Sequence, residues 1–208
     1  MDDSGFDLSL NPIYFDVLRE VGNIGAGNAV TSLSKMLDRK VDMDVPKVSM
    51  VDFNDVSNFI GGPENIVAGI LVMLTGEING IMMFLTEKDQ SRLLVEELFR
   101  QTGLIPNGTE IDEVVLSALK EVGNILTSAY LTSLSNLINK KILPSTPDIC
   151  IDMAGAILSV PAIEFSKVAD QVLLIESVFK TETDDVSGYF VLVPDFDSFK
   201  TIFSSLGV

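Results

Sequence analysis

The chain has 208 residues, 47% hydrophobic and 21% charged, which suits one compact domain or a small fused pair and excludes a disordered chain. It has no histidine and one cysteine, Cys150, which excludes imidazole-based catalysis, thiolate zinc clusters and an internal disulfide. A net charge of −16 argues against a nucleic-acid partner.

The start of the chain does not resemble a targeting segment. Residues 1–11 carry acidic side chains where a signal peptide needs positive charge. The longest apolar stretches, such as Ile66–Leu74, are far shorter than the roughly 18 residues that a membrane span requires. We therefore expect a cytoplasmic protein without membrane insertion.

Each half of the chain predicts a long helix, about three extended segments and a closing helix. Asn11 before Pro12 predicts the first helix start, and the helical pattern continues to about Leu37. Thr109 with Asp112 predicts the second cap, and that helix reaches about Ile138. Extended segments are predicted at 41–51, 66–75, 78–85, 141–152, 172–179 and 187–193. Closing helices are predicted at 87–101 and, after Asp195, at 196–206.

The two halves are copies of one another. Residues 16–24 reappear at 117–125, a shift of 101, and 80–85 match 188–193 at a shift of 108. The Gly-, Pro- and Asn-containing linker at 102–110 marks the boundary between the copies. We predict an α+β fold with pseudo-two-fold symmetry, in which repeats 1–104 and 105–208 form one compact unit with a shared or paired sheet.

One stripe of each long helix is polar. Asp16, Glu20 and Asn23 stand at i, i+4 and i+7, so they share a face that should meet solvent or a partner. The second helix repeats this stripe with Ser117, Glu121 and Asn124. The apolar residues expected to face the core are Val17, Val21 and Ile24 in the first helix and Leu119, Val122 and Leu126 in the second.

A Gly-Asn pair interrupts both helices, at Gly22-Asn23 and Gly123-Asn124. Glycine costs about 1 kcal/mol relative to alanine inside a helix, so its presence in both copies suggests a demand beyond folding. Glycine would allow another surface to approach closely, leaving the Glu carboxylate and the Asn amide to make the contacts. A solvated helix face is the alternative interpretation.

The spacing around these residues carries a family resemblance. Asp or Ser is followed after three residues by Glu, after two more by Asn, and after twenty-two more by Pro. The pattern occurs twice, as Asp16, Glu20, Asn23 and Pro46 and as Ser117, Glu121, Asn124 and Pro147. It resembles the signature of the CheC/CheX/FliY phosphatases of bacterial and archaeal chemotaxis. Two motifs without an added domain are most similar to the CheC-type members.

The resemblance implies hydrolysis of the aspartyl phosphate of the response regulator CheY. Asn23 and Asn124 would orient the attacking water, while Glu20 and Glu121 would pair with a lysine of the regulator. The regulator itself would bring Mg²⁺, so the chain would need no cofactor or metal of its own.

The remaining motif residues have supporting roles in this interpretation. Asp16 and Ser117 would add a rim contact or orient the neighbouring side chain, and Pro46 and Pro147 would shape the turn that leaves the first strand. The copies differ where Gly25–Asn28 corresponds to Leu126–Ala129, and the bulkier version would change the approach of the regulator.

Further partners are also implied by the resemblance. Family members bind the receptor deamidase CheD, and Asp152 with the following residues to Ala156 is a candidate contact. A strand end followed by a buried helix start is the alternative for that segment. Because one chain carries both motifs, we expect a monomer.

Other interpretations compete with a phosphatase. Gly22, Gly25 and Gly27 have the wrong order for a nucleotide loop, and Met82–Phe84 reads as a buried strand. A metal site is improbable because the acidic cluster lacks the required spacing; it comprises Asp184, Asp185, Asp195 and Asp197. The main alternative is a non-catalytic adaptor that binds phosphorylated CheY and regulates CheD.

Overall fold

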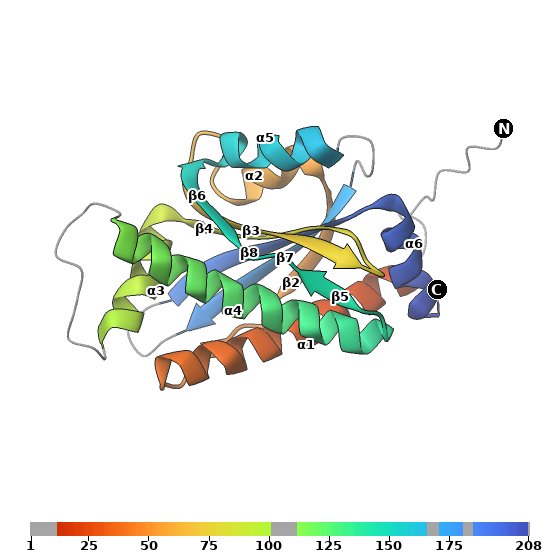
Figure 1. Cartoon of the computed structure of the whole chain (residues 1–208), viewed down its shortest axis with the longest axis horizontal. Coiled ribbons are helices and arrows are strands. Elements are labelled where there is room, and N and C mark those ends of the chain that lie inside the picture. Colours follow the sequence, from red (N-terminus) through yellow and green to blue (C-terminus); the bar gives the residue numbers. More distant parts are fainter. Residues whose placement is uncertain (1–11, 101–111, 166–170, 181–184, 208) are drawn as a thin grey trace.

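A computed structural model describes residues 12–100, 112–165, 171–180 and 185–207 (Figure 1). Four predicted features lie outside these residues: the Asn11 cap, Thr109, the 102–110 linker and Asp184. The boundary between the predicted repeats 1–104 and 105–208 therefore stays a prediction.

The two halves of the chain contain the same series of elements. The first half comprises α1 (Pro12–Leu37), β1 (Asp42–Met43), β2 (Lys47–Asp52), a 3-10 turn (Phe53–Asp55), α2 (Val56–Phe59), β3 (Ile66–Gly76), β4 (Gly80–Glu87) and α3 (Lys88–Arg100). The second half comprises α4 (Glu113–Ile138), β5 (Ile142–Pro144), β6 (Asp148–Met153), α5 (Ala154–Phe165), β7 (Gln171–Lys180), β8 (Asp185–Pro194) and α6 (Phe196–Ser205). The predicted long helices, the extended segments at 66–75, 78–85, 172–179 and 187–193, and the closing helices are confirmed.

Local hydrogen bonds explain several of these boundaries. The Asp112 carboxylate accepts from the backbone N–H of Val115 and starts α4, while Asp195 accepts from the N–H of Ser198 and starts α6. Both long helices end where predicted, at Leu37 and Ile138.

The first extended segment of each half has the predicted range but is interrupted. Pro46 separates β1 from β2, and Pro147 lies between β5 and β6, so each predicted strand is divided in two. Proline has no N–H for a strand ladder, which explains the interruption. Neither α2 nor α5 was predicted from the sequence. In α5 the apolar run has no amphipathic stripe and includes Pro161, so a helical period was not evident.

The strands form one antiparallel sheet in which the two halves interleave. Its order is β1-β7-β8-β4-β3-β5, with β2 also pairing with β7 and β6 with β3. The first strands of each half therefore pair with the hairpin of the other half. At the centre Met83 lies opposite Val191, and these positions correspond under the 108-residue shift. The pseudo-two-fold axis thus passes between β4 and β8.

Helices cover both faces of this sheet (Figure 1). The helices α1 and α4 lie side by side on one face, and α2 and α5 cover the other. Side chains of β4 alternate between the two cores: Met82 and Phe84 face α1 and α4, whereas Met83 faces the α5 side. This double burial explains the uninterrupted apolar run at Met82–Phe84 and confirms that it is a buried strand.

The helix glycines have a packing role that the sequence interpretation missed. A Cβ at Gly22 would lie 2.4 Å from Val48 Cγ2 on β2, and a Cβ at Gly123 would lie 2.8 Å from Ile70 on β3. Both glycines are buried. The surface that approaches them closely is the chain's own sheet, so the expectation of a demand beyond folding is wrong for these glycines.

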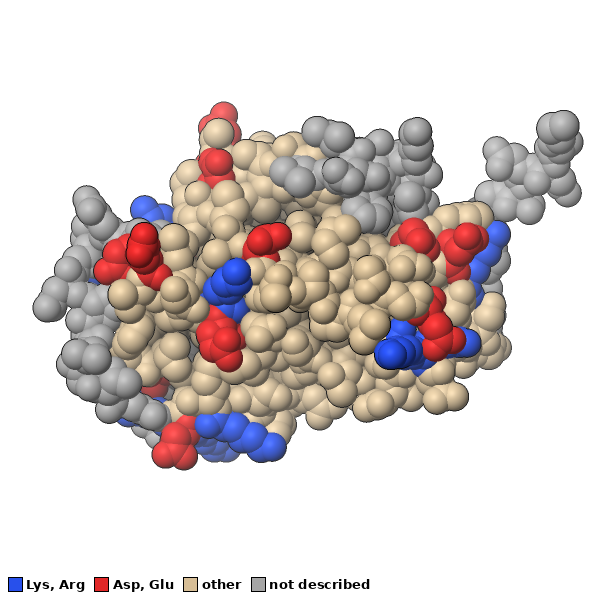
Figure 2. All heavy atoms as spheres, in the orientation of Figure 1, with Lys and Arg blue, Asp and Glu red and all other residues tan. Residues whose placement is uncertain are grey.

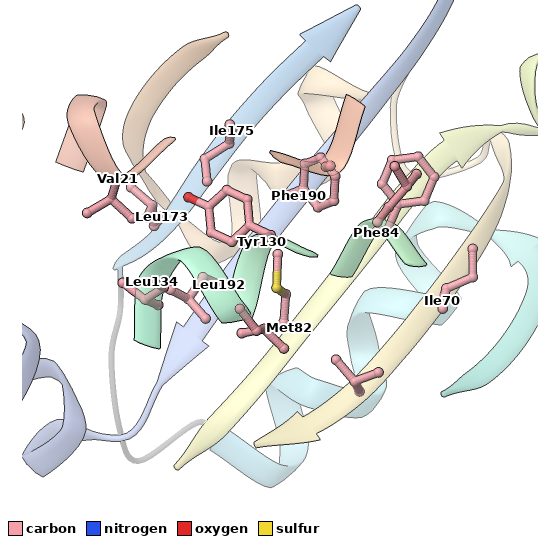
Figure 3. Close-up of a cluster of buried hydrophobic side chains, with 14 of the residues drawn as sticks. Val21, Ile70, Met82, Phe84, Tyr130, Leu134, Leu173, Ile175, Phe190 and Leu192 are labelled. Atoms are coloured by element: carbon pink, nitrogen blue, oxygen red, sulfur yellow. The ribbon is translucent and has the colours of Figure 1, made fainter. Parts of the chain in front are cut away.

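The difference between Gly25–Asn28 and Leu126–Ala129 also arises largely from packing. A Cβ at Gly25 would lie 2.4 Å from the ring of Tyr130, which stacks on Phe190 with ring centroids 5.5 Å apart (Figure 3). The equivalent pair under the 101-residue shift is Ala29 and Leu126, and both are fully buried. In both pairs the residue on α1 is small and the residue on α4 is large. The predicted effect on regulator approach is therefore wrong for Gly25 and Leu126.

Two glycines of α1 give opposite stability predictions. Gly25→Ala should lower the free energy of unfolding by about 1–3 kcal/mol, because the new methyl group overlaps the Tyr130 ring. Gly27→Ala should raise it by about 0.5–1 kcal/mol, because a Cβ there meets no atom within 4 Å and alanine favours the helix. Urea unfolding measures both. Equal effects at the two positions would contradict the packing described for Tyr130.

Candidate functional site

The buried glycine of each motif sets the direction of its polar side chains. Successive helical residues are rotated by about 100°, so with Gly22 facing the sheet, Glu20 points about 160° away from it. Asp16 and Asn23 then lie about 120° and 100° away, on the same side. Asp16 and Glu20 are exposed and Asn23 is partly buried, as this rotation requires.

The motif on α1 presents its charges to solvent. Arg19 Nη1 lies 3.7 Å from Asp16 Oδ1, and both side chains are well exposed. Glu20 makes no hydrogen bond or ion pair with a described side chain. Its carboxylate is therefore available to a partner cation.

The motif on α4 has the same arrangement. Ser117 and Glu121 are exposed, Asn124 is partly buried, and Gly123 faces the sheet. The predicted core residues on the opposite side of this helix, Leu119, Val122 and Leu126, are all buried. On α1 the prediction holds fully for Val21, which is buried, whereas Val17 and Ile24 are partly buried.

The two asparagines differ in their surroundings. The Ser128 hydroxyl, one helical turn further along α4, donates to Asn124 Oδ1 at 3.4 Å. The equivalent of Ser128 in the first copy is Gly27, which has no side chain to donate. Asn23 Oδ1 is buried and receives no hydrogen bond within the described part of the chain. Sequence reasoning missed Ser128, although the Gly27-to-Ser128 difference is visible in the aligned repeats.

The other predicted site residues are not all brought to this face. Pro46 and Pro147 are buried in the connections between short strands. Asp152 is exposed at the end of β6, where its carboxylate accepts the backbone N–H of Met153 at 2.7 Å. It precedes α5, on the opposite face of the sheet, and borders an apolar hollow between β3, β6 and α5. The segment is thus a strand end followed by a helix start.

The charges of the α1/α4 side are scattered. Figure 2 shows small groups in which acidic and basic side chains lie next to one another, with broad uncharged surface between the groups. Among the described residues, no group of three or more Asp, Glu or Cys side chains is arranged to hold a metal ion. No helix in the described ranges is long and apolar enough to cross a bilayer.

Sequence and structure comparisons identify relatives of the chain. The CheC-like family model matches residues 15–50 and 114–151, which hold the two motifs. The CheY-P phosphatase CheC of Bacillus subtilis is 34% identical over 194 residues, covering 92% of this chain and 93% of that protein.

Solved structures share the fold over nearly the whole chain. Thermotoga maritima FliY is 25% identical with a TM-score of 0.74, covering 95% of this chain and 98% of that chain. Helicobacter pylori FliM, in its complex with SpeE, has a TM-score of 0.69 at 10% identity, covering 95% of this chain and 96% of that chain, and shows the fold alone. With both motifs matched and a relative aligned along its length, the chain belongs to the CheC-like family.

Proposed function

We propose that this chain is a phosphatase that hydrolyses the aspartyl phosphate of phosphorylated CheY. The proposal rests on two Glu-x-x-Asn motifs, on α1 and α4, whose glutamates are exposed and whose asparagines are partly buried beside them. It is supported by the activity named for the Bacillus subtilis relative. Because one chain carries both motifs, we also propose that it acts as a monomer.

The chemistry of an acyl phosphate requires little from the phosphatase. A water oxygen forms a bond to phosphorus while the bond from phosphorus to the aspartyl oxygen breaks. The leaving group is a carboxylate with an ordinary pKa near 3.9, so it departs without a general acid. The proton of the water passes to solvent. A protein without histidine can therefore supply this catalysis by positioning the water.

The roles of the motif residues follow from their chemistry. The amides of Asn23 and Asn124 can hold a water by hydrogen bonding and stay neutral at all physiological pH values. The exposed carboxylates of Glu20 and Glu121 are suited to a charge-assisted bond with the regulator's lysine, which would fix the helix in register. Asp16 and Ser117 would contact the rim. Magnesium would arrive with the regulator as part of the substrate.

A second partner would use another surface. We propose that CheD, if bound, contacts the exposed end of β6 at Asp152 and the start of α5. This surface lies on the α5 side of the sheet, so CheD and CheY would not compete for the same residues. The competing function is that of an adaptor, which would bind phosphorylated CheY and CheD without hydrolysing the phosphate.

The catalytic role of the amides is tested by phosphate release. Asn23→Ala with Asn124→Ala should slow release from phosphorylated CheY by about 100-fold, because the water is no longer positioned. Regulator binding should largely survive. Asn58→Ala, at an exposed asparagine on α2 on the opposite face of the sheet, serves as the control and should release phosphate normally. Unchanged release in the double variant would favour the adaptor.

The docking role of the carboxylates is tested by affinity. Glu20→Lys with Glu121→Lys should weaken binding of phosphorylated CheY at least tenfold, because two attractive contacts become repulsive. Glu64→Lys makes the same charge change at an exposed position between α2 and β3 and should alter the affinity less than twofold. Calorimetry at physiological salt measures both. If the double variant binds like Glu64→Lys, the docking role is wrong.

The Ser128 hydroxyl should make the second site faster. In an Asn23→Ala background, where only Asn124 acts, Ser128→Ala should lower kcat about fivefold with little change in KM, since the lost bond orients the amide. In an Asn124→Ala background, Gly27→Ser should raise kcat, because it installs the same donor beside Asn23. A change confined to KM would show that Ser128 acts on docking instead.

A further inference from the structure

A basic residue accompanies the Glu-x-x-Asn motif in both copies. Arg19 precedes Glu20 and Lys120 precedes Glu121, although the chain has only 14 basic residues against 30 acidic ones. The proposed roles of the amide and the carboxylate use neither of these cations. A solvated helix face would explain one such residue, but its repetition beside both motifs of an acidic chain indicates a shared role.

Helical geometry places this cation and the glutamate on opposite sides of the asparagine. At about 100° per residue, Glu20 is rotated about 60° from Asn23 in one direction and Arg19 about 40° in the other. Arg19 lies four residues before Asn23, so the two are neighbours on the surface of α1. The residues of α4 repeat these relations at a shift of 101. Each motif therefore presents a negative group, an amide and a positive group in that order around its helix.

The contacts that the chain makes with these cations are weak. Arg19 Nη1 lies 3.7 Å from Asp16 Oδ1, and the two side chains are 61% and 77% exposed. An ion pair so exposed stabilises little, so an anion of higher charge can replace Asp16. In the second copy Ser117 stands in place of this aspartate, and Lys120 makes no ion pair with a described side chain. Both cations are therefore available to an anionic group of a partner.

The proposed substrate has a complementary order of charges. A phosphoryl group carries about 1.5 to 2 negative charges at neutral pH, and the regulator's lysine lies next to it. When the motif glutamate pairs with that lysine, the cation on the other side of the amide is left for the phosphoryl oxygens. Without such a cation, a chain with a net charge of −16 would repel the phosphoryl group.

We infer that Arg19 and Lys120 bind the phosphoryl oxygens of docked CheY, and that Asp16 or Ser117 determines how freely the cation does so. This inference rests on the proposed function. The phosphoryl charge is present before and during hydrolysis, so the contact strengthens binding of the phosphorylated form more than it accelerates the chemical step. Asp16 competes for Arg19, whereas Ser117 carries no charge to attract Lys120. The second motif therefore has the more available cation.

The phosphoryl contact is tested at one motif working alone. In an Asn23→Ala background, Lys120→Met should raise KM for phosphorylated CheY about fivefold with little change in kcat, and Lys120→Arg should keep KM within about twofold. Lys47→Met is the control, because its neighbour Val48 faces Gly22 and the exposed Lys47 side chain therefore points to the other face of the sheet. It should change neither constant. A Lys120→Met variant with an unchanged KM would overturn the inference.

Binding separates a phosphoryl contact from a general effect of charge. CheY with magnesium is titrated calorimetrically with and without beryllofluoride, a stable mimic of the aspartyl phosphate. Arg19→Met with Lys120→Met should reduce the preference of the chain for the beryllofluoride form about fivefold. Equal weakening of both forms, with the preference unchanged, would show that the cations act on the regulator's surface in general and would overturn the inference.

The role of Asp16 is tested by a double-mutant cycle at the first motif. In an Asn124→Ala background, Asp16→Ser should lower KM about twofold, because Arg19 loses its competing anion. When Arg19→Met is also present, Asp16→Ser should no longer lower KM. The same decrease with and without Arg19 would overturn this part of the inference. Absence of phosphate release by the wild-type chain would instead contradict the proposed function.

Discussion

Close contact between two buried glycines and the sheet orients the polar motif residues on the outer side of α1 and α4. Gly22 lies against Val48 and Gly123 against Ile70, at distances that leave no room for a side chain. A larger residue would lift or rotate the helix, and each degree of rotation would move the neighbouring asparagine. Each mid-helix glycine therefore fixes the position of its motif through its contact with the sheet, although the glycine itself is buried.

The interleaved sheet gives this arrangement its rigidity. Each half sends its first strands to the hairpin of the other half, so neither half has a complete sheet alone. Each motif helix packs on a strand of the other copy: a Cβ at Gly22 would lie 3.9 Å from Ile175 on β7, and a Cβ at Gly123 would lie 2.8 Å from Ile70 on β3. The copies have diverged in complementary ways, with Tyr130 filling the space above Gly25. Burial of its hydroxyl raises the pKa of Tyr130, so it stays neutral within the core.

The exposed chemistry is simple because the proposed substrate supplies most of what the reaction needs. A reactive acyl phosphate, a magnesium ion and a lysine would come with the regulator, leaving a carboxylate and an amide to this chain. The two copies offer the same pair of groups, yet only Asn124 has a serine hydroxyl on its amide oxygen. Sequence symmetry at the motif thus coexists with asymmetry one turn further along the helix.

Much of this protein is determined by its sequence alone. The two long helices, their ends, the Asp112 and Asp195 caps, the duplication and the outward Glu-x-x-Asn stripe depend on periodicity and short-range hydrogen bonds, which are readable within a few residues. The tertiary structure decided the rest. The exchange of β2 and β6 between halves, the partners of Gly22 and Gly25, and the helix α5 all depend on residues far apart in the chain. Such contacts arise from long-range packing, and no local pattern encodes which distant side chain will fill the space above a glycine.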